Sequence, residues 1–112
     1  MTDRLYLEHV LSRVGRIARY TKGGKADFLD DEKTQDAVLR NLHTLAESTQ
    51  RLSEKIKGAY PEVDWRAISG FRNVVVHNYL GLDPEQIWEI VSSDLPVLSA
   101  TVTRMLDGLG TP

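Results

Sequence analysis

The sequence predicts an all-α protein, an up-and-down bundle of four to five helices. Apolar residues recur at spacings of three and four along most of the chain, and this is the repeat of an amphipathic helix. In several segments the mean spacing is about 3.5, which is typical of helices that pack at shallow angles in left-handed bundles. The three consecutive valines at 74–76 favour a strand locally, but the chain offers no second strand segment to pair with them.

The first helix is predicted to begin after Thr2 and Asp3 and to end at about Tyr20. The Lys-Gly-Gly-Lys sequence at 22–25 ends it, and residues 21–30 are predicted to form a mobile loop. The helical repeat of this first segment is formed by Leu7, Val10, Val14 and Ile17.

The second helix is predicted to follow Asp30 and Asp31, because carboxylates suit a helix N-terminus. It should run to about Lys57, where Gly58 and Pro61 stop it. Its repeat positions are Val38, Leu42, Leu45, Thr49, Leu52 and Ile56.

Asp64 is the predicted N-cap of a third helix, which should extend from Trp65 to Tyr79 or Leu80 with Gly81 as its C-cap. The Asp-Pro-Glu sequence at 83–85 then supplies an N-cap, a proline at the first helical position and an acid in the first turn.

This last segment contains Pro96, which has no backbone N–H and clashes with the preceding turn. We therefore expect a kink or a division near Ser93 and Asp94, giving either two pieces or one bent helix.

Composition restricts the class of protein. A chain of 112 residues, 41% hydrophobic and 27% charged, suits one helical domain over residues 1–112 and neither a disordered protein nor a membrane span. It has no cysteine and begins without an apolar signal segment, so we expect no disulfide, no thiolate metal site and a cytoplasmic location. A net charge of −2 argues against broad coating of nucleic acid, so any such contact must be local.

Residues 72–79 are the strongest functional candidate, because they place several polar side chains inside an apolar run. An unpaired buried polar group costs about 1–3 kcal/mol, so a cluster of this kind serves either a structural network or chemistry. On a helix, four of the side chains share roughly half of the circumference: Arg72, Asn73, His77 and Tyr79.

This motif and its surroundings resemble the HEPN superfamily, and within it the HepT-like ribonuclease toxins. Residues 72–79 fit the family pattern of an arginine, four residues, a histidine, any residue and a tyrosine. Further signatures follow in family order and extend the resemblance to about three quarters of the chain: residues 31–38, 40–42, 60–62, 65–66, 70–73, Trp88 and 94–96.

The resemblance implies a homodimer whose two motifs form a composite active site for metal-independent RNA cleavage without a cofactor. It implies that Arg72, Asn73 and His77 are catalytic. It also implies a partner, a minimal nucleotidyltransferase antitoxin that inactivates the toxin by transferring AMP to Tyr79. Two departures are mild: Asn78 stands where relatives often have an acid, and Ala-Glu-Ser at 46–48 replaces Gly-Glu-Ala but keeps Glu47, a possible supporting residue.

The residue types suit cleavage by the neighbouring 2′-hydroxyl. His77, with an unperturbed pKa of about 6.5, can act as acid or base near neutrality. Arg72 can stabilise the phosphate charge, and Asn73 can fix the histidine tautomer or hold a phosphate oxygen. One histidine cannot easily be acid and base in one step, so a second His77 from a partner copy would solve this problem.

Other interpretations remain open. Arg72 and Asn73 could bridge to an acid such as Glu47, or the chain could be a non-catalytic subunit that binds and regulates a nucleotidyltransferase. We expect His9 and His43 to be solvated on charged helix faces, and the histidine spacing predicts no metal site. On the helical wheel Trp65 and Val76 project towards the polar half of the motif helix, which suggests a surface covered by a second copy.

Overall fold

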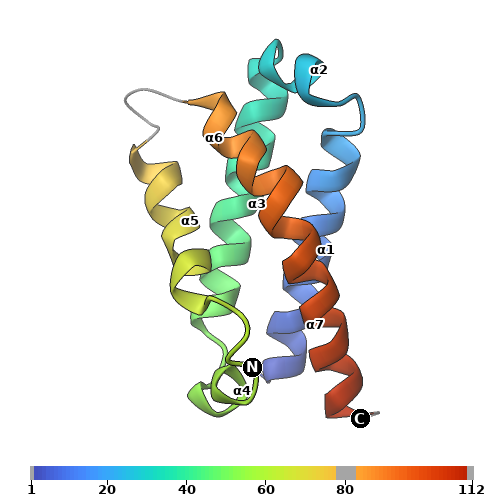
Figure 1. The fold of residues 1–112 in the computed structure, drawn as a ribbon, viewed down its shortest axis with the longest axis vertical. Coiled ribbons are helices and arrows are strands. Elements are labelled where there is room, and N and C mark those ends of the chain that lie inside the picture. Colours follow the sequence, from blue (N-terminus) through green and yellow to red (C-terminus); the bar gives the residue numbers. More distant parts are fainter. Residues whose placement is uncertain (1, 78–82, 111–112) are drawn as a thin grey trace.

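The computed structural model describes residues 2–77 and 83–110, without the side chains of residues 72–77. The described residues contain no strand, and their four long helical segments form the bundle. These segments are α1 (Asp3–Tyr20), α3 (Glu32–Gln50), α5 (Trp65–His77) and a continuous rod made of α6 (Pro84–Glu89), the π-helical turn η1 (Ile90–Asp94) and α7 (Leu95–Leu109). Two short helices, α2 (Lys25–Leu29) and α4 (Glu54–Ala59), lie at opposite ends of the bundle (Figure 1). The predicted all-α bundle is confirmed.

Helix α3 packs against α1 on one side and against α5 on the other, and α7 packs along α1 (Figure 1). Most positions of the predicted helical repeats lie in the core, whereas Val14 is only partly buried. Among the fully buried side chains are Leu7, Val10, Ile17, Val38, Leu42, Leu45, Val102 and Met105. None of the described helices combines the length and the apolarity needed to cross a lipid bilayer.

The predicted N-caps are confirmed. Asp31 begins α3 by accepting hydrogen bonds from the backbone N–H groups of Lys33 (3.1 Å) and Thr34 (3.3 Å). Donation from the hydroxyl and backbone N–H of Thr34 lowers the pKa of the Asp31 carboxyl. Asp64 caps α5 through the N–H of Ala67 (2.9 Å), and Asp83 caps α6.

The prediction of a loop over residues 21–30 is wrong, because α2 forms within it. Phe28 of α2 is fully buried, and its ring lies 5.5 Å from that of Trp88 between centroids. Gln35 donates to the carbonyl oxygens of Phe28 (2.9 Å) and Leu29 (3.1 Å), so α2 is also held by hydrogen bonds. A helix of five residues is too short to display the periodicity from which longer helices are predicted.

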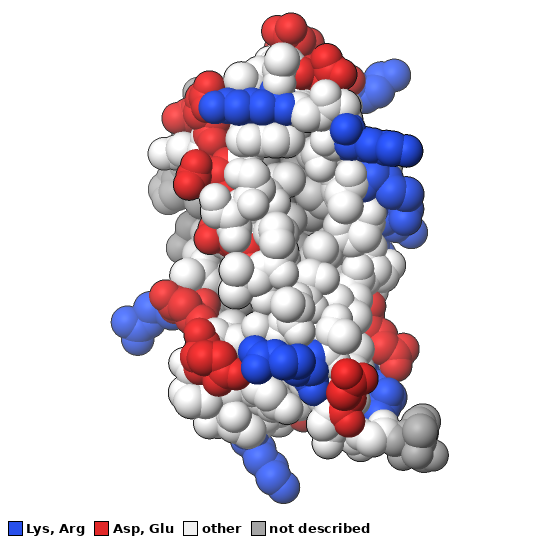
Figure 2. Space-filling model, turned by 45° about the vertical axis from the view of Figure 1, so that its right-hand side comes forward, with Lys and Arg blue, Asp and Glu red and all other residues white. Residues whose placement is uncertain are grey.

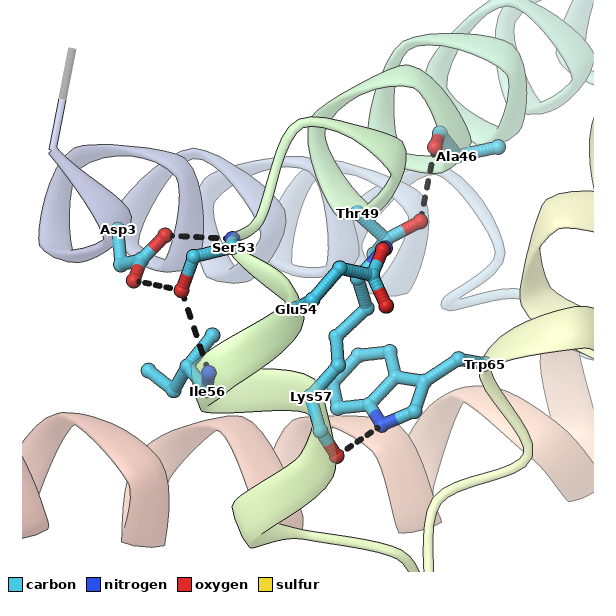
Figure 3. Close-up of polar contacts among 8 residues, drawn as sticks. All are labelled: Asp3, Ala46, Thr49, Ser53, Glu54, Ile56, Lys57 and Trp65. Carbon is cyan, nitrogen blue, oxygen red and sulfur yellow. Dashed lines mark hydrogen bonds and ion pairs between the residues drawn. The ribbon is translucent and has the colours of Figure 1, made fainter.

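The second predicted helix is divided, since α3 ends at Gln50 and α4 begins after Ser53. The hydroxyl of Ser53 accepts from the N–H of Ile56 (3.2 Å) and donates to a carboxylate oxygen of Asp3 (2.6 Å), while the other oxygen of Asp3 accepts from the Ser53 N–H (2.9 Å) (Figure 3). Leu52, within the break, and Ile56, in α4, are both buried. The apolar repeat therefore continues through a change of direction that periodicity cannot reveal.

Trp65 packs partly against the core, whereas the helical wheel placed it towards the polar half of the motif helix. Its indole is half-buried against the core and donates to the carbonyl oxygens of Lys57 (3.1 Å) and Tyr60 (3.3 Å), where the chain leaves α4 (Figure 3). Ile68 and Phe71 are buried, whereas Ala67 is exposed. The side chain of Val76 lies outside the described residues.

The expected irregularity near Ser93 and Asp94 is confirmed as the π-helical turn η1, which comes directly before Pro96. Proline cannot donate the backbone hydrogen bond of a regular helix, and a single π turn changes the register of the bonding at that point. The rod continues through it, so the segment is one interrupted helix. The predicted end of the third helix at Tyr79 or Leu80 and its C-cap Gly81 lie outside the described residues.

Replacing Ser53 tests the link between α1 and α4. The Ser53→Ala variant loses the N-cap of α4 and the hydroxyl contact with Asp3, so its free energy of unfolding should fall by about 0.5–2 kcal/mol in urea denaturation. Ser12→Ala is the matched control, since Ser12 is exposed inside α1, and it should change stability much less. Equal stabilities of the two variants would contradict this account of the link.

Candidate active site

The backbone of α5 carries three of the predicted catalytic residues. Arg72, Asn73 and His77 all belong to this helix, so they lie within about one and a half turns and about 7.5 Å along its axis. Their side chains lie outside the described residues, as does Tyr79 altogether. The structure therefore brings these three backbone positions together on one helix.

Side chains of the bundle core position α5. The buried Ile68 and Phe71 precede the motif directly and anchor the helix. Helix α3 packs along α5 and is the element that lies closest to the motif helix over its length. The competing prediction of a strand at the valines is wrong, because α5 continues through them to His77.

Glu47, the possible supporting residue, lies on α3. Its carboxylate is 3.1 Å from the Nε2 atom of His43, and the two side chains are 43% and 35% exposed. His43 is thus only partly solvated and has a carboxylate partner one turn away, which corrects the expectation for this residue. Among the described residues, His43 is the hydrogen-bond partner of Glu47.

His9 is also not simply solvated, because it takes part in a network between α1 and α3. Its Nδ1 atom lies 2.7 Å from the hydroxyl oxygen of Ser48, and its Nε2 atom lies 3.0 Å from the Nη2 atom of Arg13. Arg13 also donates to the amide oxygen of Asn41 (3.4 Å). A guanidinium is only a donor, so Nε2 of His9 must be the acceptor and Nδ1–H must donate to Ser48.

This geometry fixes His9 as neutral. Burial lowers the pKa of its imidazole, and the charges of Arg13 and Arg16 lower it further. The network was missed because a wheel drawn for one helix does not show which neighbouring helix covers it. The spacing of His9, Arg13 and Arg16 by four and three along one face of α1 was the available signal.

A groove of about 380 Å³ lies between α1 and α3 beside this network. The polar side chains that line it include His9, Thr44, Glu47, Ser48 and Arg51. Over the part of the chain that the structure describes, no three His, Asp or Glu side chains come close enough to hold a metal ion.

The helical bundle and the position of the motif on α5 agree with the resemblance to the HEPN class. The family model named "Ribonuclease HepT-like" matches residues 10–105, which is most of the chain. The chain therefore belongs to the HepT-like ribonuclease family, and its membership identifies it as a ribonuclease.

Individual relatives agree with this family. "Probable ribonuclease HepT" of Thermococcus cleftensis is 32% identical over 101 residues, which cover 89% of this chain and 92% of that protein. "Putative RNase MJ0127" of Methanocaldococcus jannaschii is 35% identical over 94 residues, 83% of this chain and 78% of that protein. The same organism has "Gamma-glutamylcyclotransferase and putative RNase MJ0434", 28% identical over 95% of this chain but only 48% of that longer protein. No solved structure matches the chain significantly.

The lowered pKa of His9 predicts a pH dependence of stability. In the unfolded chain the imidazole takes up a proton near its ordinary pKa of about 6.5, whereas the folded protein resists protonation. The unfolded state therefore binds more protons as the pH falls through about 6.5, and the folded state loses stability. Urea unfolding at about pH 7.5 and 5.5 should show a smaller loss for His9→Asn than for the unchanged chain. The same loss in both proteins would contradict the burial of a neutral His9.

Proposed function

We propose that this ribonuclease is the toxin of a toxin–antitoxin pair and that it cleaves RNA internally without a metal ion. The observation that carries the proposal is the placement of Arg72, Asn73 and His77 within one and a half turns of α5, in a family of ribonucleases. Ile68 and Phe71 hold this helix in the core, which gives the motif a rigid support.

The proposed reaction begins with attack of the RNA 2′-oxygen on the adjacent phosphorus. The new P–O2′ bond forms while the P–O5′ bond breaks, so the products are a 2′,3′-cyclic phosphate and a 5′-hydroxyl. One proton must leave O2′ and another must reach O5′, and His77 is suited to such transfers near neutral pH. Arg72 would stabilise the charge that develops on the phosphate, and Asn73 would orient His77 or a phosphate oxygen.

A homodimer completes this scheme. One imidazole cannot easily accept and donate a proton in a single step, so a cleft shared by two copies would supply one His77 as the base and the other as the acid. Glu47 of α3 is proposed as a supporting residue, because α3 packs along the motif helix and its carboxylate is only partly buried.

The proposed partner is a minimal nucleotidyltransferase that acts as the antitoxin. The phenol oxygen of Tyr79 would attack the α-phosphorus of ATP, release pyrophosphate and retain AMP. The modification adds bulk and negative charge two residues from His77, where the substrate phosphate must bind. Steric exclusion and charge repulsion would then block the cleft.

RNA cleavage by the purified chain in excess EDTA tests the catalytic proposal. The unmodified protein should cleave, and His77→Ala should lower the rate by about 10²–10⁴-fold, the typical contribution of one acid or base. Ser12→Ala, on the exposed side of α1, should cleave at the unchanged rate. If the unmodified protein fails to cleave in EDTA, the proposal of a metal-independent nuclease is wrong. The alternative of a non-catalytic subunit that regulates a nucleotidyltransferase then becomes the better account.

Intact mass after co-expression with the neighbouring nucleotidyltransferase tests the regulation. The chain should gain one or more AMP units at Tyr79 and lose RNA cleavage. Tyr79→Phe should gain none and should stay active in the presence of the transferase, because it lacks the acceptor oxygen. Tyr20→Phe is the matched control, since Tyr20 is exposed on α1, and it should still be modified. Modification of Tyr79→Phe to the same extent would place the acceptor elsewhere.

A further inference from the structure

Four arginines belong to α1 and α3 or directly follow them: Arg13 and Arg16 on α1, Arg40 on α3, and Arg51 as the C-cap of α3. Within the described part of the chain, none of them is found in an ion pair. We call these four residues the arginine face. Because the whole chain has a net charge of −2, a group of cations without acidic partners is a local exception.

Arg13 is the best defined member of the arginine face. It is held by the Nε2 atom of His9 and by the amide oxygen of Asn41, and both acceptors are neutral. Asn41 is 5% exposed, and its amide nitrogen donates to the carbonyl oxygen of Ala37 (2.8 Å), which directs the amide oxygen towards Arg13. The guanidinium is therefore fixed in position while its charge stays uncompensated.

Arg13 keeps part of its donor capacity. A guanidinium has five N–H groups, and the three contacts with His9 and Asn41 account for three of them. The remaining two suit a phosphate, which guanidinium groups bind with parallel hydrogen bonds. A cation that is already ordered binds an anion at a smaller cost in conformational entropy.

The groove beside Arg13 offers a further donor. Ser48 is 5% exposed, lines the groove and accepts from His9, so its own O–H is left to donate. Two acids also line the groove, and each already contacts another side chain: Glu8 lies 4.0 Å from Arg4, and Glu47 lies 3.1 Å from His43.

The first turns of α3 carry the exposed acids Glu32 and Asp36. Asp36 lies one helical turn before Arg40 on α3 and is the acid closest in sequence to that arginine. In Figure 2, Lys and Arg side chains gather along the upper right-hand margin, whereas the centre of the drawn face carries few charges.

We infer that the arginine face binds phosphate groups of the RNA strand as it extends beyond the cleavage site. Helix α3 packs against α1 on one side and against α5 on the other, so the arginines of α1 lie up to two interhelical distances, about 16–20 Å, from the motif helix. This inference rests on the proposed function for its ligand. It explains how a net acidic protein holds RNA, since backbone binding requires only a local group of cations.

Binding of a single-stranded RNA that carries 2′-O-methyl groups separates affinity from cleavage, because it has no 2′-hydroxyl to react. In fluorescence anisotropy with the full chain, the combined variant Arg13→Gln, Arg16→Gln and Arg40→Gln should raise Kd at least tenfold at low salt. The slope of log affinity against log salt should fall by about 2, because each phosphate contact on a single strand contributes about 0.7.

Arg104→Gln is the matched control, because Arg104 lies on α7, contacts Glu62 at 3.6 Å and lies outside the arginine face. It should bind like the unchanged chain. If the combined variant does not fold, Arg16→Gln and Arg40→Gln can be measured singly, since both side chains are exposed and have no side-chain hydrogen bond within the described residues.

An unchanged Kd and salt slope in the combined variant would overturn the inference. An equal loss of affinity in Arg104→Gln would also overturn it, because the effect would then reflect net charge alone. Cleavage of unmodified RNA by the unchanged chain is measured beside these assays. If the unchanged chain cleaves RNA but the arginine substitutions do not change binding, the inference is wrong and the proposed function stands. If the arginine substitutions weaken binding but the unchanged chain does not cleave RNA, the proposed function is wrong and the arginine face is an RNA-binding surface.

Discussion

The burial of α3 is the constraint on which the rest of the structure depends. This helix contacts α1, α5 and the α6 end of the rod. Its neighbours therefore cover more of its surface than the apolar stripe of an amphipathic helix, and some polar residues are buried as well. Leu42 and Leu45 are fully buried, and the polar Asn41 and Ser48 are almost fully buried. A buried polar side chain must find partners, and those of Asn41 and Ser48 come from Arg13, Ala37 and His9. The polar network between α1 and α3 thus follows from enclosing α3.

The motif helix α5 is anchored at its beginning. Its beginning is fixed by the Asp64 cap, by the hydrogen bonds of Trp65 and by the burial of Ile68 and Phe71. The motif positions come after these anchors, at the end of α5 that is farthest from the cap.

The sequence predicts well the helices that follow from a repeated spacing of apolar residues. It predicts poorly the features that depend on how distant segments pack against each other. The long helices follow from the spacing of residues such as Leu42 and Leu45, and the interruption follows from Pro96, which acts within its own chain segment. The turn between α3 and α4 could not be predicted because Leu52 and Ile56 keep the repeat across it. Of the site, the sequence indicates the motif on α5 by its pattern, whereas the environments of Trp65 and His9 depend on segments that pack against them from elsewhere in the chain.

The arrangement of charge connects substrate binding with the proposed regulation. A net charge of −2 weakens long-range attraction of RNA, so productive binding must rely on short-range contacts with cations that are already in place. Arg13 meets this requirement because its acceptors, His9 and Asn41, are neutral and leave its charge available. A site that depends on a few local cations is also sensitive to a single added anion. Under the proposed regulation, transfer of AMP to Tyr79 would add bulk and negative charge two residues from His77, where the substrate phosphate must bind. One modification could then silence a nuclease whose fold it leaves intact.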